Sequence, residues 1–594
     1  MKYLTEIHTI LGSLYGETRA KELQERLSVI IERYTSLIPT GTDAGQSVRL
    51  TEKDALLITY ANQVTERGSP PLETLSRFCK KYLIGAVSGI HILPFFPSSS
   101  DDGFSVIDYK EVNPDFGDWR DIERLGEDFR LMFDAVINHI SVESTWFKGF
   151  LRGDPHYQDT FISVTGNPDL SQVVRPRALP LLTEFQTAAG DQKVWTTFST
   201  DQVDLNYHHP QVLFDIIDVL LFYVSKGAEF IRLDAIAYLW KEIGTSCIHL
   251  SQTHAVVQLF RAILDGMGSG VLLITETNVP HADNISYFGD GTNEAHMVYN
   301  FALPPVVLHT LHSQNTSILS AWVSELQLPS DQVTFFNFLA SHDGIGLNPA
   351  RGILADAQID FLIELTKENG GLVSYKTNPD GSESPYELNI NYFDALNRPG
   401  DTQPLELQVG KFMAAQAIML TLLGVPGIYF HSLFGSRGWT EGVQITGRNR
   451  TINRQKIERT RLERALVNPE TRQEMVFAQF QRLLKVRAKT PAFHPLGSQH
   501  VLDAGSSIFA LARFSPPADN PSGDRSGVLS LQNVSPTRKL AALKHEDLDS
   551  LKILGQRRPD LILGEFHNLD STHPIVLEPF QTLWIDITQT SSFS

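Results

Sequence analysis

Two carboxylates stand directly after apolar runs of the sequence, where they could act on a bound substrate. Asp234 follows the run EFIRL, and Glu276 follows the run VLLIT. A carboxylate pair at neighbouring strand ends suits glycoside chemistry, because one group can attack the anomeric carbon while the other protonates the leaving oxygen and later deprotonates the acceptor. The pattern predicts Asp234 as nucleophile and Glu276 as general acid/base. The reaction would retain the anomeric configuration if the two carboxyl groups lie about 5 Å apart.

A basic residue accompanies the first carboxylate. Arg232 precedes Asp234 by two positions, and side chains alternate along a strand, so both point to the same side. The Arg232 guanidinium would keep the Asp234 carboxylate ionised and oriented. Taken alone, an R-x-D pair is more often a structural ion pair. The surrounding sequence is needed to distinguish a structural from a catalytic role.

The elements that would hold these residues alternate along the chain. From residue 54 onward, eight short apolar runs alternate with longer amphipathic stretches, as parallel βα units require. The runs lie near residues 55, 85, 130, 229, 271, 296, 334 and 424. Eight such units predict an α/β fold, a (β/α)₈ TIM barrel, whose active sites form at the carboxyl ends of the strands. The polar residues that follow the third, fourth, fifth and seventh runs would meet there: Asp134, Asn138, His139, Arg232, Asp234, Glu276, His342 and Asp343.

Further regions are expected in the 594 residues, because one hydrophobic core rarely supports a chain of this length. Apolar positions at helical spacing, among them Leu4, Ile7 and Leu11, predict an N-terminal helical extension. Long segments after strands three and seven predict inserted subdomains. Short β-rich runs near the end predict a C-terminal β-domain. The expected bounds are 1–50 for the extension, 51–490 for the barrel with inserts at about 140–205 and 350–410, and 491–594 for the β-domain.

Composition excludes several classes of partner. The net charge of −18 argues against nucleic acid, because phosphate neutralisation needs a positive surface. Cys79 and Cys247 are the only cysteines, too few for a disulfide framework, so a cytoplasmic location is expected. The N-terminal residues lack the apolar stretch of a signal peptide, and no run reaches the roughly 18 apolar residues of a membrane span. Neither a glycine-rich phosphate loop nor metal-ligand spacing occurs, so no cofactor is expected.

Four motifs in sequence order resemble the signature regions of the α-amylase family, glycoside hydrolase family 13: DAVINH, FIRLDAIAY, ITETN and FLASHD. The resemblance implies that Asp234 is the nucleophile, Glu276 the acid/base and Asp343 a third carboxylate that stabilises the distorted sugar ring. It also implies that His139 and His342 bind glucose. For a lone histidine, a core or surface position would be the ordinary expectation.

The segment HILPFFPSSSDDGF after the second strand resembles the glucose pocket of that family. The resemblance implies that Asp101 binds sugar hydroxyls and that Phe104 stacks against the face of the sugar ring. From its residue type alone, Phe104 would be assigned to core packing.

A closer resemblance is to the sucrose phosphorylase subfamily, and it rests on LDAIAYLWKEIGTSC, YNFALPP, SHDGIGL and RTINR. It implies a double displacement, in which Asp234 forms a β-glucosyl enzyme and phosphate then releases α-D-glucose 1-phosphate. Arginine forks match phosphate oxygens. By resemblance, Arg177 and Arg450 are the phosphate candidates, with surface salt bridges as the alternative. Tyr238 matches an acceptor-side aromatic residue, although an inward tyrosine could equally be structural.

Departures from that subfamily concern the acceptor side. Glu276 is followed by the segment TNV where sucrose phosphorylases have an aromatic-rich run, and HDGIGL continues as NPARG. These segments resemble the branch that converts 2-O-α-D-glucosylglycerate and phosphate reversibly to α-D-glucose 1-phosphate and D-glycerate. An anionic acceptor accounts for the surplus of arginines, and Arg351 is a further candidate for its carboxylate.

Other activities stay open. A sucrose, sucrose 6-phosphate or glucosylglycerol phosphorylase would keep every catalytic residue and differ in the acceptor loops. A hydrolase or transglucosidase would form the same glucosyl enzyme, so phosphate dependence discriminates. A catalytically inactive relative is disfavoured, because all three carboxylates are present. The subfamily resemblance also implies a homodimer.

Overall fold

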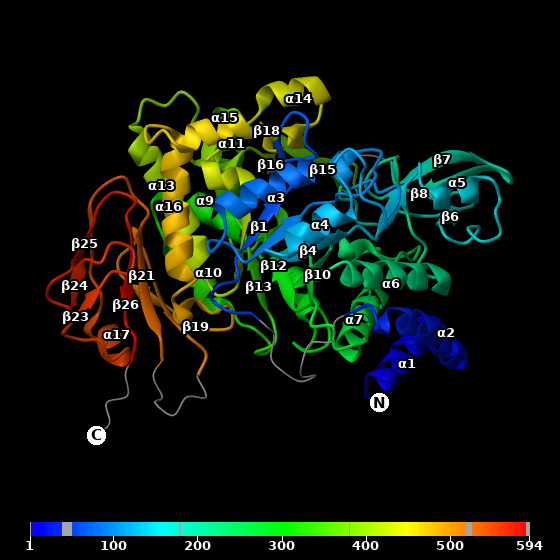
Figure 1. Cartoon of the computed structure of the whole chain (residues 1–594), viewed down its shortest axis with the longest axis horizontal. Coiled ribbons are helices and arrows are strands. Elements are labelled where there is room, and N and C mark those ends of the chain that lie inside the picture. The colour runs from blue at the N-terminus through cyan, green and yellow to red at the C-terminus, as the bar shows by residue number, and fades with distance from the viewer. Residues whose placement is uncertain (1, 39–49, 178–179, 379, 518–524, 590–594) are drawn as a thin grey trace.

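The structure is a computed structural model of the chain, and it describes residues 2–38, 50–177, 180–378, 380–517 and 525–589. Eight parallel strands close into a central barrel, in the order β1-β17-β13-β12-β11-β10-β4-β3 (Figure 1). The expected (β/α)₈ barrel and its eight strands are confirmed. The strand bounds are β1 (Leu56–Thr59), β3 (Gly89–Ile92), β4 (Arg130–Ala135), β10 (Ala228–Leu233), β11 (Leu272–Thr275), β12 (Met297–Tyr299), β13 (Thr334–Asn337) and β17 (Val425–Tyr429).

The barrel strands are short apolar runs because both of their faces are covered. Every residue of β1 and of β11 is buried, as expected for parallel strands between a packed interior and an outer layer of helices. That outer layer and the short segments associated with it are formed by α3 (Pro71–Tyr82), α4 (Trp119–Gly126), α6 (Pro210–Ser225), α7 (Ser251–Gly266), α8 (His281–Ile285), α9 (Leu303–Ser313), α10 (Ser317–Glu325), α13 (Leu405–Thr421), α14 (Thr440–Thr446), α15 (Arg459–Leu466), α16 (Arg472–Arg487), β2 (Val64–Thr65) and β18 (Ile457–Glu458).

Strand register brings the polar residues to one level of the barrel. Arg232 of β10 pairs with Asp134 of β4. On the other side of β10, Leu233 pairs with Thr275 of β11. Asp234 and Glu276, the residues that follow this last pair, therefore leave neighbouring strands at the same height.

Both insertions expected after strands three and seven are present. The first contains β5 (His139–Ser141), α5 (Thr145–Leu151), β6 (Ser163–Val164), β7 (Leu182–Thr187), β8 (Gly190–Trp195) and β9 (Gln202–Asp204). The second contains β14 (Ile345–Gly346), α11 (Asp356–Glu368), β15 (Leu372–Thr377), β16 (Glu383–Asn389) and α12 (Tyr392–Leu396). Strand β14 starts two residues after Asp343 and pairs with β16, so the second insertion folds back beside the end of strand seven.

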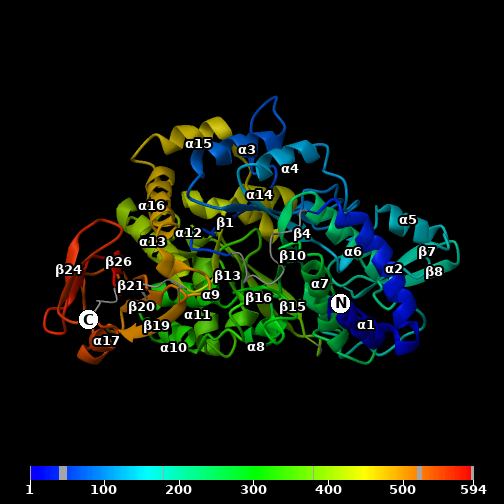
Figure 2. The same cartoon turned by 60° about the horizontal axis from the view of Figure 1, so that its bottom comes forward.

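The N-terminal extension is a pair of helices, α1 (Lys2–Tyr15) and α2 (Glu17–Thr35). Gly16 joins them with a φ of 91°, a value that favours glycine. Helix α1 packs on α7 and α2 packs on α6 (Figure 2). Residues 39–49 of the expected extension lie outside the described residues.

The C-terminal region is rich in strands, as expected, and lies at the opposite end of the molecule from the first insertion (Figure 1). Its main sheet has the order β19-β20-β21-β26. Within the described ranges, no helix has the length and apolar character needed to cross a membrane. The elements are β19 (Ser498–Asp503), β20 (Ile508–Phe514), β21 (Gly527–Asn533), β22 (Lys539–Ala541), α17 (His545–Ser550), β23 (Gln556–Pro559), β24 (Phe566–Leu569), β25 (Ile575–Leu577) and β26 (Thr582–Asp586).

Candidate active site

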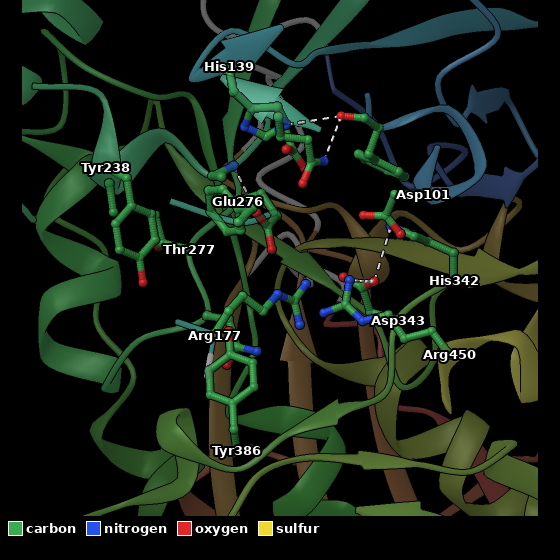
Figure 3. A pocket seen from close by; sticks show the side chains of 17 residues that line it. Asp101, His139, Arg177, Tyr238, Glu276, Thr277, His342, Asp343, Tyr386 and Arg450 are labelled. Atoms are coloured by element: carbon green, nitrogen blue, oxygen red, sulfur yellow. Dashed lines mark hydrogen bonds and ion pairs between the residues drawn. The ribbon is translucent and has the colours of Figure 1, made fainter. Parts of the chain in front are cut away.

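A cavity lies at the carboxyl ends of the barrel strands, and most of the residues singled out from the sequence line it (Figure 3). They come from the segments that follow six different strands, as expected for the mouth of a TIM barrel. The predicted residues that line the cavity are Asp101, Phe104, His139, Arg177, Asp234, Tyr238, Glu276, His342, Asp343 and Arg450.

Arg232 holds Asp234 from inside the barrel. The Arg232 side chain is 3% exposed, and its Nη1 lies 2.9 Å from Oδ1 of Asp234. The same Nη1 donates to Asp134, which also lies 2.7 Å from Nε2 of His91. Arg232 thus forms a buried structural ion pair and is also the cation that orients Asp234. The structural and the functional interpretations of the R-x-D pair are therefore compatible.

A residue with strained backbone geometry lies between Asp234 and Glu276. Ala235, directly after Asp234, has a φ of 49°, in the left-handed region that residues other than glycine rarely adopt. This turn directs the Ala235 N–H toward Oε2 of Glu276, at 3.0 Å. Glu276 is therefore anchored to the residue that follows Asp234.

Asp234 and Glu276 share an environment that favours one proton between them. Burial raises the pKa of both carboxyl groups. The charge of Asp343 raises both pKa values further, and the charge of Glu276 also raises that of Asp234, while Arg232 lowers both. Arg232 lies 2.9 Å from Asp234 but 3.8 Å from Glu276. The roles expected from the sequence need the negative charge on Asp234 and the proton on Glu276, and the shorter distance from Arg232 to Asp234 favours that arrangement.

Asp343 has the opposite electrostatic setting. Burial alone would raise the pKa of its carboxyl group, but the charges of Arg450 and Arg454 outweigh burial and hold the pKa below its usual range. Nη1 of Arg450 lies 2.5 Å from Oδ1 of Asp343, and Nη2 of Arg454 lies 3.4 Å from it. Asp343 is therefore ionised over the whole physiological pH range.

The predicted sugar-binding residues gather at one end of the cavity. Phe104 stacks on His342, with ring centroids 4.7 Å apart and planes 6° apart. Burial lowers the pKa of His342 to about 3, so its imidazole is neutral. Nε2 of His139 donates to the Phe104 carbonyl at 3.0 Å, and its Nδ1 accepts from Asn138 at 3.3 Å. Both ring nitrogens of His139 thus have protein partners.

Arg454 holds the turn that carries Asp101 at this end of the cavity. Its guanidinium lies 2.7 Å from Oδ2 of Asp102 and 3.4 Å from Oδ1 of Asp101. Asp101 and Asp102 both have positive φ values, 53° and 51°, so the two carboxylates are presented by a strained turn.

The three arginines predicted to bind anions differ in their surroundings. Arg450 is held by both oxygens of the buried Glu387, at 3.0 and 2.6 Å, as well as by Asp343. Arg177 points into the cavity (Figure 3), and no side chain of a described residue forms an ion pair or hydrogen bond with its guanidinium. Arg351, a described residue, is not brought to the cavity: it lies 3.6 Å from the exposed Asp356.

Several lining residues were not indicated by the sequence. Phe198 and Gln202 come from the first insertion and Tyr386 from the second. Gln202 donates to the Phe104 carbonyl at 3.0 Å and so helps to fix that ring. These residues lie in segments whose length was the only signal. Within the residues that the structure describes, no group of three or more His, Cys, Asp or Glu side chains could hold a metal ion.

A closed (β/α)₈ barrel with three carboxyl groups and neutral histidines in one cavity at its mouth is the arrangement of a carbohydrate-active enzyme. The family model "Alpha amylase, catalytic domain" matches residues 81–344. The chain is 52% identical over 537 residues to the glucosylglycerate phosphorylase of Spirochaeta thermophila, with 90% of each chain covered. It is 44% identical over 581 residues to the glucosylglycerate phosphorylase of Escherichia coli, covering 98% of this chain and 99% of the relative.

Among solved structures, the sucrose 6F-phosphate phosphorylase from Thermoanaerobacter thermosaccharolyticum matches with a TM-score of 0.70 and 25% identity. The match covers 83% of this chain and 97% of that one. The chain therefore belongs to the α-amylase family and, within it, to the phosphorylase group that these relatives represent.

Proposed function

We propose that this chain is a retaining phosphorylase that converts 2-O-α-D-glucosylglycerate and phosphate reversibly to α-D-glucose 1-phosphate and D-glycerate. The similarity to two glucosylglycerate phosphorylases along most of both chains supports this substrate. The structural observation that carries the proposal is Arg177, a cation without a side-chain partner among the described residues, inside a cavity lined by carboxylates. A hydrolase that uses water needs no such cation, whereas phosphate and a carboxylate both do.

In the first step, an oxygen of Asp234 attacks the anomeric carbon, and the bond from that carbon to O2 of glycerate breaks. Glu276 gives its proton to the leaving oxygen, so D-glycerate departs as the alcohol. Arg232 keeps Asp234 ionised for the attack. Asp343 stabilises the positive charge that develops on the sugar ring, because it is ionised and fixed by Arg450.

In the second step, phosphate takes the place of glycerate. Glu276, now ionised, accepts a proton from phosphate while a phosphate oxygen attacks the anomeric carbon. The bond to Asp234 breaks, the carboxylate of Asp234 is restored, and α-D-glucose 1-phosphate leaves. Two inversions give net retention.

The same cation serves both acceptors in turn. Arg177 binds the glycerate carboxylate in one step and phosphate in the other, and Tyr238 forms an aromatic wall of this acceptor side. Arg450 contributes mainly by holding Asp343, since three of its N–H groups already have carboxylate partners. The glucosyl group lies at the opposite end, where Asp101, Phe104 and His342 bind it and His139, whose ring nitrogens have protein partners, lines its pocket.

The deciding experiment is release of glucose 1-phosphate from four α-glucosides, each with and without phosphate: 2-O-α-D-glucosylglycerate, sucrose, sucrose 6-phosphate and glucosylglycerol. Asp234→Ala is the blank. We expect phosphate-dependent cleavage of the glycerate compound. Preference for another glucoside would keep the mechanism and overturn the acceptor, whereas release of free glucose without phosphate would identify a hydrolase.

We also infer a cytoplasmic homodimer. Cys79 and Cys247 are both buried and free, which suits a reducing compartment. The dimer rests on the subfamily resemblance, and the net charge of −18 disfavours a nucleic-acid partner. Sedimentation equilibrium would test the dimer, and a monomer at micromolar concentration would refute it.

A further inference from the structure

The N-terminal helices have no role in the two steps derived above, yet the end of α1 reaches the segment behind the active site (Figure 2). Tyr15 is the last residue of α1. Its ring packs against that of Trp240, with centroids 6.2 Å apart, and its hydroxyl donates to the Tyr207 carbonyl at 2.9 Å. Trp240 is 3% exposed and lies on the segment that follows Asp234. The extension is therefore joined to the segment that carries the nucleophile.

Trp240 lies at the end of a short, tightly wound segment. This segment begins at Ala235, whose N–H donates to Glu276 at 3.0 Å, and continues as the 3₁₀ helix η2 (Ile236–Tyr238). The N–H of Tyr238 donates to the Ala235 carbonyl at 3.2 Å. Because the bonds of a 3₁₀ helix span only three residues, a shift of Trp240 moves Tyr238 as well.

The position of the Trp240 ring is set by packing. The ring of His208 lies 4.4 Å from it, and Nε2 of His208 donates to the Lys241 carbonyl at 2.8 Å. The indole N–H of Trp240 is buried and has no hydrogen-bond partner among the described residues. Aromatic neighbours therefore hold this ring in place of a hydrogen bond. Of these neighbours, His208 precedes α6, whereas Tyr15 belongs to the extension.

Tyr238, at the other end of this link, faces the acceptor. It lines the cavity, and in Figure 3 it lies across the cavity from Asp101 and His342 at the glucose end. Its ring meets the edge of Phe198, with centroids 5.5 Å apart. A tilt of the Tyr238 ring would therefore change the space for the acceptor and leave the glucose end as it is.

We propose that Tyr15 is a positioning residue for the acceptor side: through Trp240 it fixes the turn that carries Tyr238, so the N-terminal helices contribute to acceptor binding. The inference rests on the proposed function, which places phosphate and D-glycerate beside Tyr238. Tyr15 touches neither acceptor. Its loss should weaken acceptor binding and leave the attack of Asp234 on the sugar unchanged.

The test compares the two half-reactions in Tyr15→Ala. KM for phosphate and KM for D-glycerate should each rise roughly 3- to 10-fold, the effect expected for one aromatic packing contact. With α-glucosyl fluoride, kcat/KM measures only formation of the glucosyl enzyme, and it should stay at the wild-type value. Tyr15→Phe keeps the ring and loses the bond to Tyr207, and it should retain the wild-type KM values.

Tyr3→Ala is the matched control. Tyr3 lies near the other end of α1 and packs over Gly266, the last residue of α7, where a Cβ atom would lie 2.4 Å from Cδ2 of the Tyr3 ring. The change loosens the same helix away from the acceptor, so its KM values should equal those of the wild type. In a Tyr238→Ala background, Tyr15→Ala should add nothing to the acceptor KM, since it acts through Tyr238. If thermal melting followed by circular dichroism shows that Tyr15→Ala does not fold, Tyr15→Leu takes its place throughout.

The outcomes separate this inference from the proposed function. A wild type that does not use phosphate would overturn both. Use of another acceptor in place of D-glycerate would overturn the proposed function alone, and KM for phosphate would still test Tyr15. Unchanged acceptor KM values in Tyr15→Ala, or an equal rise in Tyr3→Ala, would overturn the role of Tyr15. An equal rise in Tyr15→Phe would assign the effect to the bond with Tyr207 and overturn the link through Trp240.

Discussion

At the residue scale, three carboxyl groups in one cavity take different protonation states because their cations differ. Asp343 has Arg450 at 2.5 Å, and Asp234 has Arg232 at 2.9 Å. Glu276 has its nearest guanidinium nitrogen at 3.8 Å and instead accepts from a backbone N–H. Burial raises the pKa of all three groups, and a nearby guanidinium opposes that effect, most effectively at Asp343. The distances to the guanidinium groups support the proposed role of Glu276 as the acid.

Glu276→Gln should remove the alkaline limb of the pH profile. The pKa of Glu276 is raised, so the wild type keeps its acid protonated as pH rises and loses activity only above that raised pKa. The variant has no proton to lose there, and its kcat/KM for glucosylglycerate should fall by about 10²- to 10⁴-fold. Initial rates between pH 5 and 9 measure both. With α-glucosyl fluoride as substrate, whose leaving group needs no proton, the kcat/KM of the variant should fall far less. An alkaline limb that persists in the variant would assign the acid elsewhere.

Arg177→Gln should weaken both anionic acceptors together. One charged hydrogen-bonding partner contributes about 1.5–3 kcal/mol, so KM for phosphate and for D-glycerate should each rise roughly 10- to 100-fold. The matched control is Arg351→Gln, since Arg351 is exposed and lies beside Asp356; its KM values should stay within about twofold. A rise for phosphate with an unchanged KM for D-glycerate would mean that the two anions use different cations.

The sequence indicated the residues that follow strands, but not those whose partners come from another insertion. Asp234 and Glu276 are predictable because each ends an apolar run. The ion pair between Arg450 and Glu387 forms only when the second insertion folds back beside strand seven. Nothing local distinguishes Glu387 from an exposed glutamate in a strand. For the same reason, the sequence could not separate Arg177, which points into the cavity, from Arg351, which does not.

At the element scale, the barrel was predictable because fully buried parallel strands leave an unbroken apolar signature. The insertions were recognised by length alone, since their short antiparallel strands follow no strong period. Strand β16 is the most consequential of these. It pairs with β14 and carries both Tyr386, which lines the cavity, and Glu387, which holds Arg450. The second insertion is therefore part of the active site and not an appendage.

Glu387→Leu should lower both the stability of the protein and its activity. The Glu387 side chain is 1% exposed, and its loss leaves the largely buried Arg450 with Asp343 as its remaining carboxylate partner. Breaking a buried pair from one side costs about 3–5 kcal/mol. Urea denaturation measures the free energy of unfolding. Glu383→Leu, an exposed position on the same strand, should change it by no more than about 0.5 kcal/mol. Equal effects of the two changes would remove the structural role given to this pair.

At the scale of the whole molecule, buried arginines join the barrel to the C-terminal region. Arg487 at the end of α16 donates to the carbonyls of Asp54 at 2.9 Å and Phe493 at 3.2 Å. Arg513 of β20 donates to the carbonyl of Thr421, the last residue of α13, at 2.6 Å. Backbone carbonyls at element ends need donors when they are buried. These two side chains meet that need across the junction.

Arg513→Met should weaken the coupling between the two regions. The change removes donors from three carbonyls, those of Thr421, His494 and Ser498, and each buried acceptor left unpaired costs about 1–3 kcal/mol. We expect the wild type to unfold in urea as one transition. In the variant, fluorescence from Trp584 in β26 should change before the far-UV circular dichroism of the barrel helices.

Arg525→Met is the control for this coupling, because Arg525 bonds to Ser515 and Ser498 within the C-terminal region and is only partly buried. It should lower stability by less and leave a single transition. Selective excitation of Trp584 requires the other tryptophans to be replaced by phenylalanine in every variant compared. If Arg513→Met still unfolds in one transition at an unchanged midpoint, the junction is held by apolar packing and not by the arginine, since Phe509, Leu511 and Trp584 belong to the same hydrophobic core as the barrel.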